Sequence, residues 1–122
     1  MGLQRLSTSW VCENGVRELT IVGDIDISTV PEFDEQLCEV RRDDPFSLIV
    51  SLAQCTYCDS TGLSVLLRHA RQTPNFIVVS PEGTDVRRLL RVAGVEKALG
   101  VVDDLSKARA AARFEGQFVK GL

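Results

Sequence analysis

The segment from Ser47 to Gln72 limits the folds open to this chain more than any other. It begins with the apolar run Leu48–Leu52, which is β-branched in its middle and does not alternate, as expected of a strand covered on both faces. After a short polar stretch, apolar residues recur at the i, i+3, i+4, i+7 spacing of one helix face, namely Leu63, Leu66, Leu67 and Ala70. A buried strand followed by an amphipathic helix predicts a strand–helix unit of an α/β domain.

The flanking sequence continues this alternation of strands and helices. Asn14-Gly15 lies between the segments Trp10–Cys12 and Leu19–Val22 and predicts an opening β-hairpin. Thr29 and Glu32 have the spacing of a capping box at the start of a first helix, and Thr84 is a candidate cap for a third. We therefore expect an α/β fold with a mixed β-sheet of four or five strands. The hairpin forms an edge of that sheet, the central strands are parallel and the helices pack on it.

The predicted elements fit one domain. The chain has 122 residues, 44% of them hydrophobic, and contains no repeat, low-complexity segment or linker. We expect a single domain over residues 1–122, with a core from about residue 8 to 113 and a frayed tail from Phe114. His69 is assigned to the polar face of its helix, and three arginines of the third helix are assigned to a solvated face: Arg87, Arg88 and Arg91.

The charge balance restricts the partners. Seventeen acidic and 14 basic residues give a net charge of -3, which predicts neither a nucleic-acid surface nor a cationic membrane-binding surface. The sequence shows no apolar run long enough to span a membrane and no signal-peptide pattern. We expect a cytoplasmic protein whose partners are proteins or small molecules.

The four cysteines predict neither disulfides nor a metal site. Reduced thiols are expected, and the single CxxC pair, Cys55 and Cys58, has only one histidine in the chain to accompany it. A thiol–disulfide exchanger stays open as an alternative, although its first cysteine normally begins a helix, whereas the capping residues here follow Cys58. The chain lacks the phosphate-binding glycine loops of NTPases and kinases, so no cofactor and no catalytic residue is assigned.

Polar residues follow two of the predicted strands. Asp24 and Asp26 end the second strand of the hairpin, and Asp59 and Ser60 follow the central strand. Sites in α/β sheets lie at the carboxyl ends of strands, so these residues share one surface if the two strands are neighbours. From spacing alone, Asp59, Ser60 or Thr61 can serve as the cap of the following helix.

The order of elements and these motifs resemble the STAS domain family, and within it the bacterial anti-sigma factor antagonists. Gly23–Asp26 is similar to the Gly-Glu-Leu-Asp-like segment of the family, and Thr29–Pro31 to its Thr-x-Pro-like helix start. Asp59–Leu63 is similar to its Asp-Ser-Ser/Thr-Gly-Leu segment. The resemblance implies a single STAS-like domain that acts by binding and is not an enzyme.

The resemblance also implies a phosphorylation switch. Ser60 follows Asp59 as the modified serine of the family does, so the unphosphorylated chain is expected to bind an anti-sigma factor serine kinase and free a sigma factor until Ser60 is phosphorylated. The implied partner-binding residues are Asp24, Asp26, Asp59, Ser60, Thr61 and Gly62. An STAS interaction module in another signalling or transport assembly stays open, as does weak homodimerisation through the exposed hairpin edge.

Overall fold

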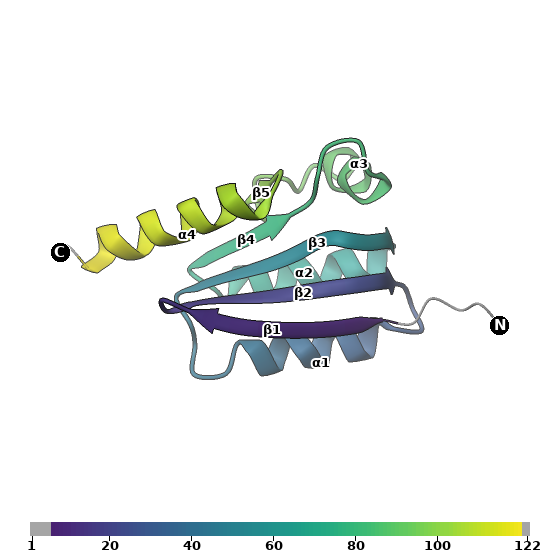
Figure 1. The fold of residues 1–122 in the computed structure, drawn as a ribbon. Helices are drawn as coiled ribbons and strands as arrows, with labels where there is room; N and C mark the ends of the chain where they lie inside the picture. The colour runs from purple at the N-terminus through teal and green to yellow at the C-terminus, as the bar shows by residue number, and fades with distance from the viewer. Residues whose placement is uncertain (1–5, 121–122) are drawn as a thin grey trace.

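A five-stranded mixed sheet forms the centre of the computed structural model, which describes residues 6–120 and the side chains of residues 6–113 (Figure 1). The strands are β1 (Ser7–Glu13), β2 (Val16–Ile25), β3 (Ser47–Cys58), β4 (Asn75–Val79) and β5 (Val101–Val102), arranged in the order β1-β2-β3-β4-β5. The helices are α1 (Val30–Val40), α2 (Ser60–Arg71), α3 (Asp85–Val92) and α4 (Leu105–Lys120). The predicted fold class is confirmed.

The opening hairpin forms one edge of the sheet, as predicted. β1 and β2 are antiparallel and joined by Asn14 and Gly15, whose φ angles are 55° and 78°. A two-residue turn with positive φ at both positions matches the twist of the two strands, and asparagine and glycine adopt that conformation at the lowest cost.

β3 is the central strand, hydrogen-bonded in parallel register to β2 on one side and β4 on the other. Its alternate residues enter two separate cores. Leu48, Val50 and Leu52 face the larger core under α1, α2 and α3, whereas Ile49 faces a smaller core under α4. Burial on both faces explains why the run has no apolar–polar alternation.

The helices cover the sheet unequally (Figure 1). α1, α2 and α3 pack their buried side chains against the strands in the larger core. α4 lies on the opposite face and packs Ala108 and Ala112 against Ile49, Ile77 and Val79. The small alanine side chains let α4 lie close to the strands. Within the described residues, no helix combines the length and the apolar character needed to cross a membrane.

The predicted capping box at the start of α1 is wrong. Thr29 is the N-cap residue, but its φ and ψ of −106° and −12° are helical, and its side chain makes no capping hydrogen bond. Its hydroxyl instead donates to the carbonyl of Asp24 and accepts from the amide of Asp26. A capping hydroxyl needs an extended N-cap backbone, and the tight bend after β2 prevents that conformation.

The placement of His69 on the polar face of α2 is also wrong. The buried face of α2 is rotated toward Val65, Leu66 and His69, and the histidine side chain is only 1% exposed. Its Nδ1 lies 2.9 Å from an Arg41 nitrogen, and its Nε2 lies 2.7 Å from Asp34. Because arginine can only donate, Nδ1 accepts and Nε2 carries the proton. Partners on α1 and just after it therefore make burial of this polar ring possible.

The solvated position predicted for Arg87 is wrong as well, whereas Arg88 and Arg91 are exposed as predicted. The Arg87 side chain is 11% exposed and donates to the carbonyl of Ser80 and to carboxylates of Glu96 and Asp103. These contacts hold α3 to the segment between it and α4. Buried guanidinium groups are tolerated when their donors are paired in this way.

The C-terminal helix extends further than the sequence suggested. The backbone of α4 remains helical to Lys120, past Phe114 where fraying was expected, and residues 121–122 lie outside the described part. A helix that has already been nucleated lengthens at little cost per residue, even where its apolar periodicity is weak.

Candidate functional site

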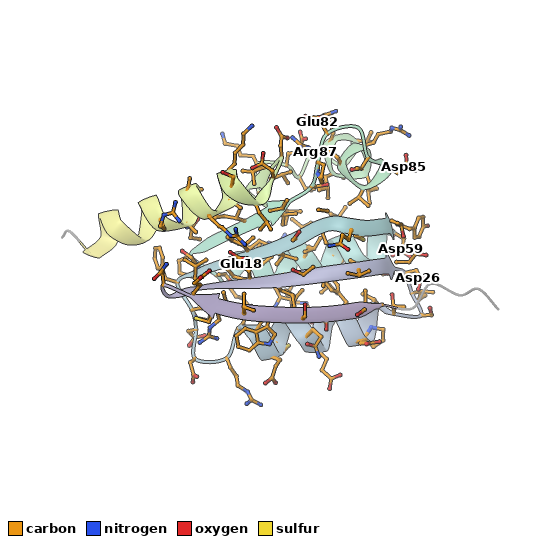
Figure 2. All side chains as sticks on the ribbon, in the orientation of Figure 1. Glu18, Asp26, Asp59, Glu82, Asp85 and Arg87 are labelled. Atoms are coloured by element: carbon orange, nitrogen blue, oxygen red, sulfur yellow. The ribbon has the colours of Figure 1, made fainter. Side chains whose placement is uncertain are left out.

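The carboxyl ends of β2 and β3 meet at one edge of the sheet. Asp24 lies opposite Tyr57 in the parallel register, and the amide of Asp59 donates to the carbonyl of Ile25 at 3.1 Å. The hydroxyl of Thr56 donates to the carboxylate of Asp24 and adds a side-chain link between the strands. Figure 2 shows Asp26 and Asp59 at this same end of the sheet. The prediction that the two polar segments share one surface is therefore correct, and we call it the junction surface: Asp24, Asp26, Asp59, Ser60 and Thr61.

Asp59 is the cap of α2. Its backbone is extended, with φ −105° and ψ −174°, and its Oδ1 accepts from the amides of Thr61 and Gly62 at 3.0 and 3.3 Å. The hydroxyl of Thr61 donates to the same oxygen. The choice that spacing left open is thus made by the backbone, because only Asp59 stands outside the helix with its oxygen over the first turn.

Ser60 is the first residue of α2 and differs from its neighbour in exposure. It is exposed, and its hydroxyl forms no hydrogen bond within the described part of the chain, whereas Thr61 is half-buried and bound to Asp59. The fold thus leaves the Ser60 hydroxyl accessible to a partner and uses the Thr61 hydroxyl in a hydrogen bond.

Asp26, half-buried just after β2, holds the loop into α1. Oδ1 of Asp26 accepts from the amide and hydroxyl of Ser28 at 2.9 and 2.7 Å and from the amide of Thr29 at 3.1 Å. The hydroxyl of Ser28 is the main cause of the lowered pKa of Asp26, and the two amides add to it. Asp26 therefore carries its negative charge at neutral pH, on the same surface as Asp24 and Asp59.

Gly62 brings α2 close to the sheet. A β-carbon at this position would lie 2.5 Å from Cγ2 of Ile25 and 2.9 Å from Sγ of Cys58. Both contacts are shorter than van der Waals separation, so a side chain cannot fit without movement of the helix or the strands. The glycine therefore serves packing beneath the junction surface.

A groove of about 540 Å³ lies between the end of β3, the start of α2 and the helix α3. It contains Ser60, and its walls include large apolar side chains that are exposed, with Tyr57 at 51% and Val92 at 79%. The remaining lining residues are Cys58, Asp59, Asp85, Val86, Arg88 and Leu89. Sequence reasoning missed the contribution of α3, although Val92 falls outside the apolar face of that helix and was a signal for an additional role.

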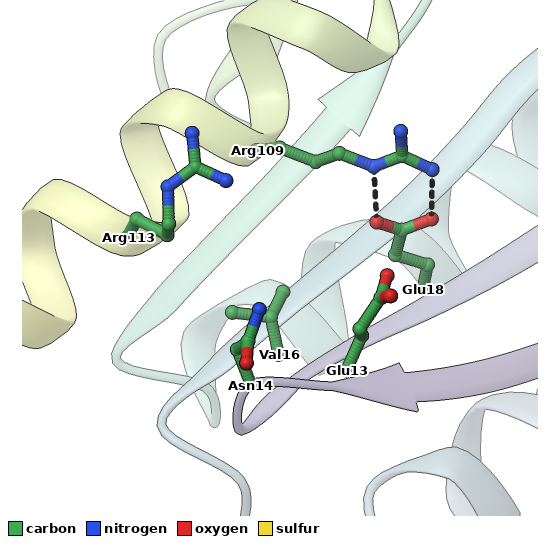
Figure 3. Close-up of a pocket in the computed structure, with 6 residues that line it drawn as sticks. All are labelled: Glu13, Asn14, Val16, Glu18, Arg109 and Arg113. Atoms are coloured by element: carbon green, nitrogen blue, oxygen red, sulfur yellow. Dashed lines mark hydrogen bonds and ion pairs between the residues drawn. The ribbon is translucent and has the colours of Figure 1, made fainter.

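A second, much smaller hollow lies at the other end of the sheet (Figure 3). Its centre is a two-pronged ion pair in which Arg109 of α4 donates to both carboxylate oxygens of Glu18 on β2, at 2.5 and 2.9 Å. The cavity of about 30 Å³ has no room for a ligand beyond a water molecule. This contact, between residues 91 positions apart, attaches α4 to the sheet.

The CxxC pair is part of the core. Cys55 and Cys58 are each 6% exposed and belong to the larger hydrophobic cluster. Burial raises the pKa of Cys55 to about 11 and that of Cys58 to about 12. Thiol–disulfide exchange requires a thiolate near neutral pH, so this geometry does not support the redox alternative.

Asp34, Cys38 and His69 bring potential metal ligands within 4.8 Å of one another. The nearby cations do not favour a metal ion there. Arg68 pairs with Asp34 at 3.2 Å, Arg41 donates to Nδ1 of the histidine, and the proton on Nε2 points at Asp34. The cluster joins α1 to α2 by hydrogen bonds and leaves no histidine lone pair for a metal.

Comparison with known proteins identifies the family. Residues 13–103 match the family model described as Mlab, STAS domain, and this chain belongs to the STAS domain family. It is 32% identical over 98 residues to the anti-sigma-F factor antagonist RsfB of Mycobacterium tuberculosis, covering 78% of this chain and 80% of that protein. It is 29% identical over 87 residues to the anti-sigma-B factor antagonist of Staphylococcus aureus, covering 69% and 81%.

Solved structures agree with this assignment. The crystal structure of an anti-sigma factor antagonist from Mycobacterium paratuberculosis superposes with a TM-score of 0.83 at 25% sequence identity. The match covers 88% of this chain and 94% of that one. These relatives are all named as anti-sigma factor antagonists, and none of the names describes an enzyme.

Proposed function

We propose that this chain is an anti-sigma factor antagonist whose binding is switched by phosphorylation of Ser60. In its unphosphorylated form it binds a cytoplasmic anti-sigma factor with serine-kinase activity, so that the sigma factor held by that partner is freed. The observation that carries the proposal is the exposed Ser60 hydroxyl at the start of α2, beside the carboxylates of the junction surface. The names of the relatives supply the class of partner.

Ser60 is a better phosphate acceptor than Thr61. Its hydroxyl is exposed and unbonded within the described part, whereas that of Thr61 donates to Asp59. In the transfer, Oγ of Ser60 forms a bond to the γ-phosphorus of ATP, the bond from that phosphorus to ADP breaks, and the hydroxyl proton passes to a base of the kinase. This chain contributes only the acceptor hydroxyl.

The added charge changes the surface that the partner must cover. A phosphoserine carries about −1.5 to −2 charges at neutral pH. It would stand next to Asp59, whose carboxylate already occupies the amides of Thr61 and Gly62. A partner that fits the neutral hydroxyl would have to desolvate a dianion without a matching contact. The phosphate therefore acts on binding, while Ser60 itself has no packing role to lose.

The exposed apolar residues of this end supply contact area for the partner. Ile27, in the loop before α1, is 75% exposed, and Tyr57 projects from the end of β3. Ile27 and Tyr57 lie among the carboxylates of Asp24 and Asp26. Such a mixed surface suits a partner that combines apolar side chains with basic ones. Gly62 contributes by positioning α2 against Ile25 and Cys58.

A titration of the cognate anti-sigma kinase tests the proposal. Ser60→Asp is expected to weaken binding by at least about tenfold, because a charge is introduced at the contact. Ser60→Ala is expected to retain binding and accept no phosphate. Calorimetry with purified proteins measures the first effect, and incubation with ATP measures the second. Equal affinity of Ser60→Asp and the parent would exclude the electrostatic switch.

The identity of the partner is tested separately. A pull-down with the unphosphorylated chain is expected to recover an anti-sigma kinase. Recovery of a transporter ATPase without any anti-sigma kinase would instead assign the chain to the alternative class of STAS modules, those that act in transport or other signalling assemblies.

A further inference from the structure

The groove beside Ser60 contains a cationic side chain, that of Arg88. Arg88 projects from α3 and lines the same groove as Ser60. Its side chain is 71% exposed, and its ion pair with Asp85, one turn earlier on the same helix, is long at 3.5 Å. Exposed pairs of this kind contribute little free energy, so the guanidinium is available for a stronger anion.

The charges around Ser60 single out this arginine. Among the residues that line the groove, Asp59 and Asp85 are acidic and would repel a phosphate, and Arg88 is the basic one. The neighbouring residues Tyr57 and Cys58 carry no positive charge. A phosphate on Ser60 thus has one attractive side-chain charge across the groove.

The helix terminus offers the phosphate less than usual. Helix N-termini commonly bind phosphate through free amides. Here the amides of Thr61 and Gly62 already donate to Asp59, and the amide of Leu63 donates to the Asp59 carbonyl. A phosphate attached at Ser60 would have to displace the cap to reach them, whereas Arg88 is free to turn.

We propose that Arg88 is the phosphate-binding residue of the phosphorylated form. Its guanidinium leaves Asp85, crosses the groove from α3 and pairs with the phosphate on Ser60. This inference rests on the proposed phosphorylation of Ser60. It also gives the position of the phosphate, which would lie with the guanidinium in the groove between Tyr57 and Val92. Phosphorylation then fills a hollow that the unphosphorylated protein leaves open, in addition to changing its charge.

The full chain with phosphoserine incorporated at position 60 during translation tests this without a kinase. Phosphorus NMR follows the second ionisation of the phosphate, which titrates near pH 6 in an unpaired phosphoserine. A neighbouring guanidinium favours the dianion, so this pKa is expected to be lower in the parent than in Arg88→Gln by roughly half a unit at low salt. Arg88→Lys should keep part of the shift, and added salt should shrink it.

Arg91→Gln is the matched control. Arg91 lies on the same helix and pairs with Glu82, and it does not line the groove. Its replacement is expected to leave the phosphate titration at the parent value. Identical titrations of the parent and Arg88→Gln, or an equal shift in Arg91→Gln, would overturn the proposal. If no kinase phosphorylates Ser60, the proposed function fails, and the ion pair is still measured in the translated phosphoprotein.

Discussion

Two strand-to-helix junctions of this domain use polar residues in opposite ways. At the junction from β3 to α2, the single residue Asp59 separates strand from helix and caps it. At the junction from β4 to α3, a longer loop ends at Thr84, whose hydroxyl accepts from the amide of Arg87 at 3.1 Å. Both helices are capped. In the β3–α2 junction the residue after the cap, Ser60, has a hydroxyl that is exposed and forms no hydrogen bond within the described chain.

The difference lies in where the remaining polar groups go. The α3 junction turns Arg87 inward, where it binds the carbonyl of Ser80 and the carboxylates of Glu96 and Asp103. The α2 junction makes local bonds around Asp59 and keeps Ser60 at the surface. Polar residues at strand ends are therefore no sign of function in themselves. An accessible group with no structural task is the better indicator.

The largest effect on stability is expected from the α3 junction. Arg87→Gln removes a nearly buried charge that several partners surround, and it should lower the free energy of unfolding by about 2 kcal/mol. The exposed Arg88→Gln is the control and should stay within about 0.5 kcal/mol of the parent. Urea denaturation of both variants makes the comparison. Equal stabilities would mean that the inward ion pairs do not hold α3.

Gly62→Ala is expected to cause a loss of stability of similar size. The new methyl group would overlap Ile25 and Cys58, and overpacking of this kind costs about 1–3 kcal/mol. Ser64→Ala, at an exposed position of the same helix, should be nearly neutral. Thermal unfolding distinguishes the two. A fully stable Gly62→Ala protein would show that α2 can move away from β2 at no cost.

Removal of either cap is expected to cost less. Asp59→Ala and Thr84→Ala should each lower stability by about 1 kcal/mol, since each removes the side-chain acceptor of its first turn. The two junctions should differ in binding, because only Asp59 lies on the junction surface. Denaturation paired with partner titration checks both, and weaker partner binding by Thr84→Ala than by Asp59→Ala would reverse the assignment.

The smallest effect on stability is expected from a change of pH, through the titration of His69. Burial lowers the pKa of His69 despite the hydrogen bond to Asp34, and His69 is the one histidine of the chain. Below about pH 6.5 the unfolded chain therefore binds a proton that the folded chain does not, and stability should fall as the pH falls. Denaturation at pH 7.5 and 5.5 measures this slope, which His69→Gln should flatten. An unchanged slope would contradict the buried neutral ring.

What the sequence predicted well depends on local signals. The Asn14-Gly15 turn needs only positive φ at two adjacent residues, and the Thr84 cap needs only the turn that follows it. The central position of β3 follows from an apolar run with no polar face. The pairing of the Asp26 and Asp59 segments required one further step, the rule that parallel strands end at the same edge of a sheet.

What the sequence could not predict depends on distant partners. The buried state of His69 needs Arg41 and Asp34, which lie 28 and 35 residues away, and helical periodicity counts any histidine as polar. The groove beside Ser60 exists because α3 brings Arg88 and Val92 next to the end of β3. No spacing within one element contains that information.

The most direct test of the central claim is the site at which the kinase places its phosphate. Incubation of the chain with ATP and its cognate anti-sigma kinase, followed by mass mapping, should locate one phosphoryl group on Ser60. Thr61→Ala should still be modified, and Ser60→Ala should not. A phosphate on Thr61, or modification that survives in Ser60→Ala, would contradict the account. Ser60 would then not be the acceptor, and in the first case the phosphate would stand on a hydroxyl that the fold binds to Asp59.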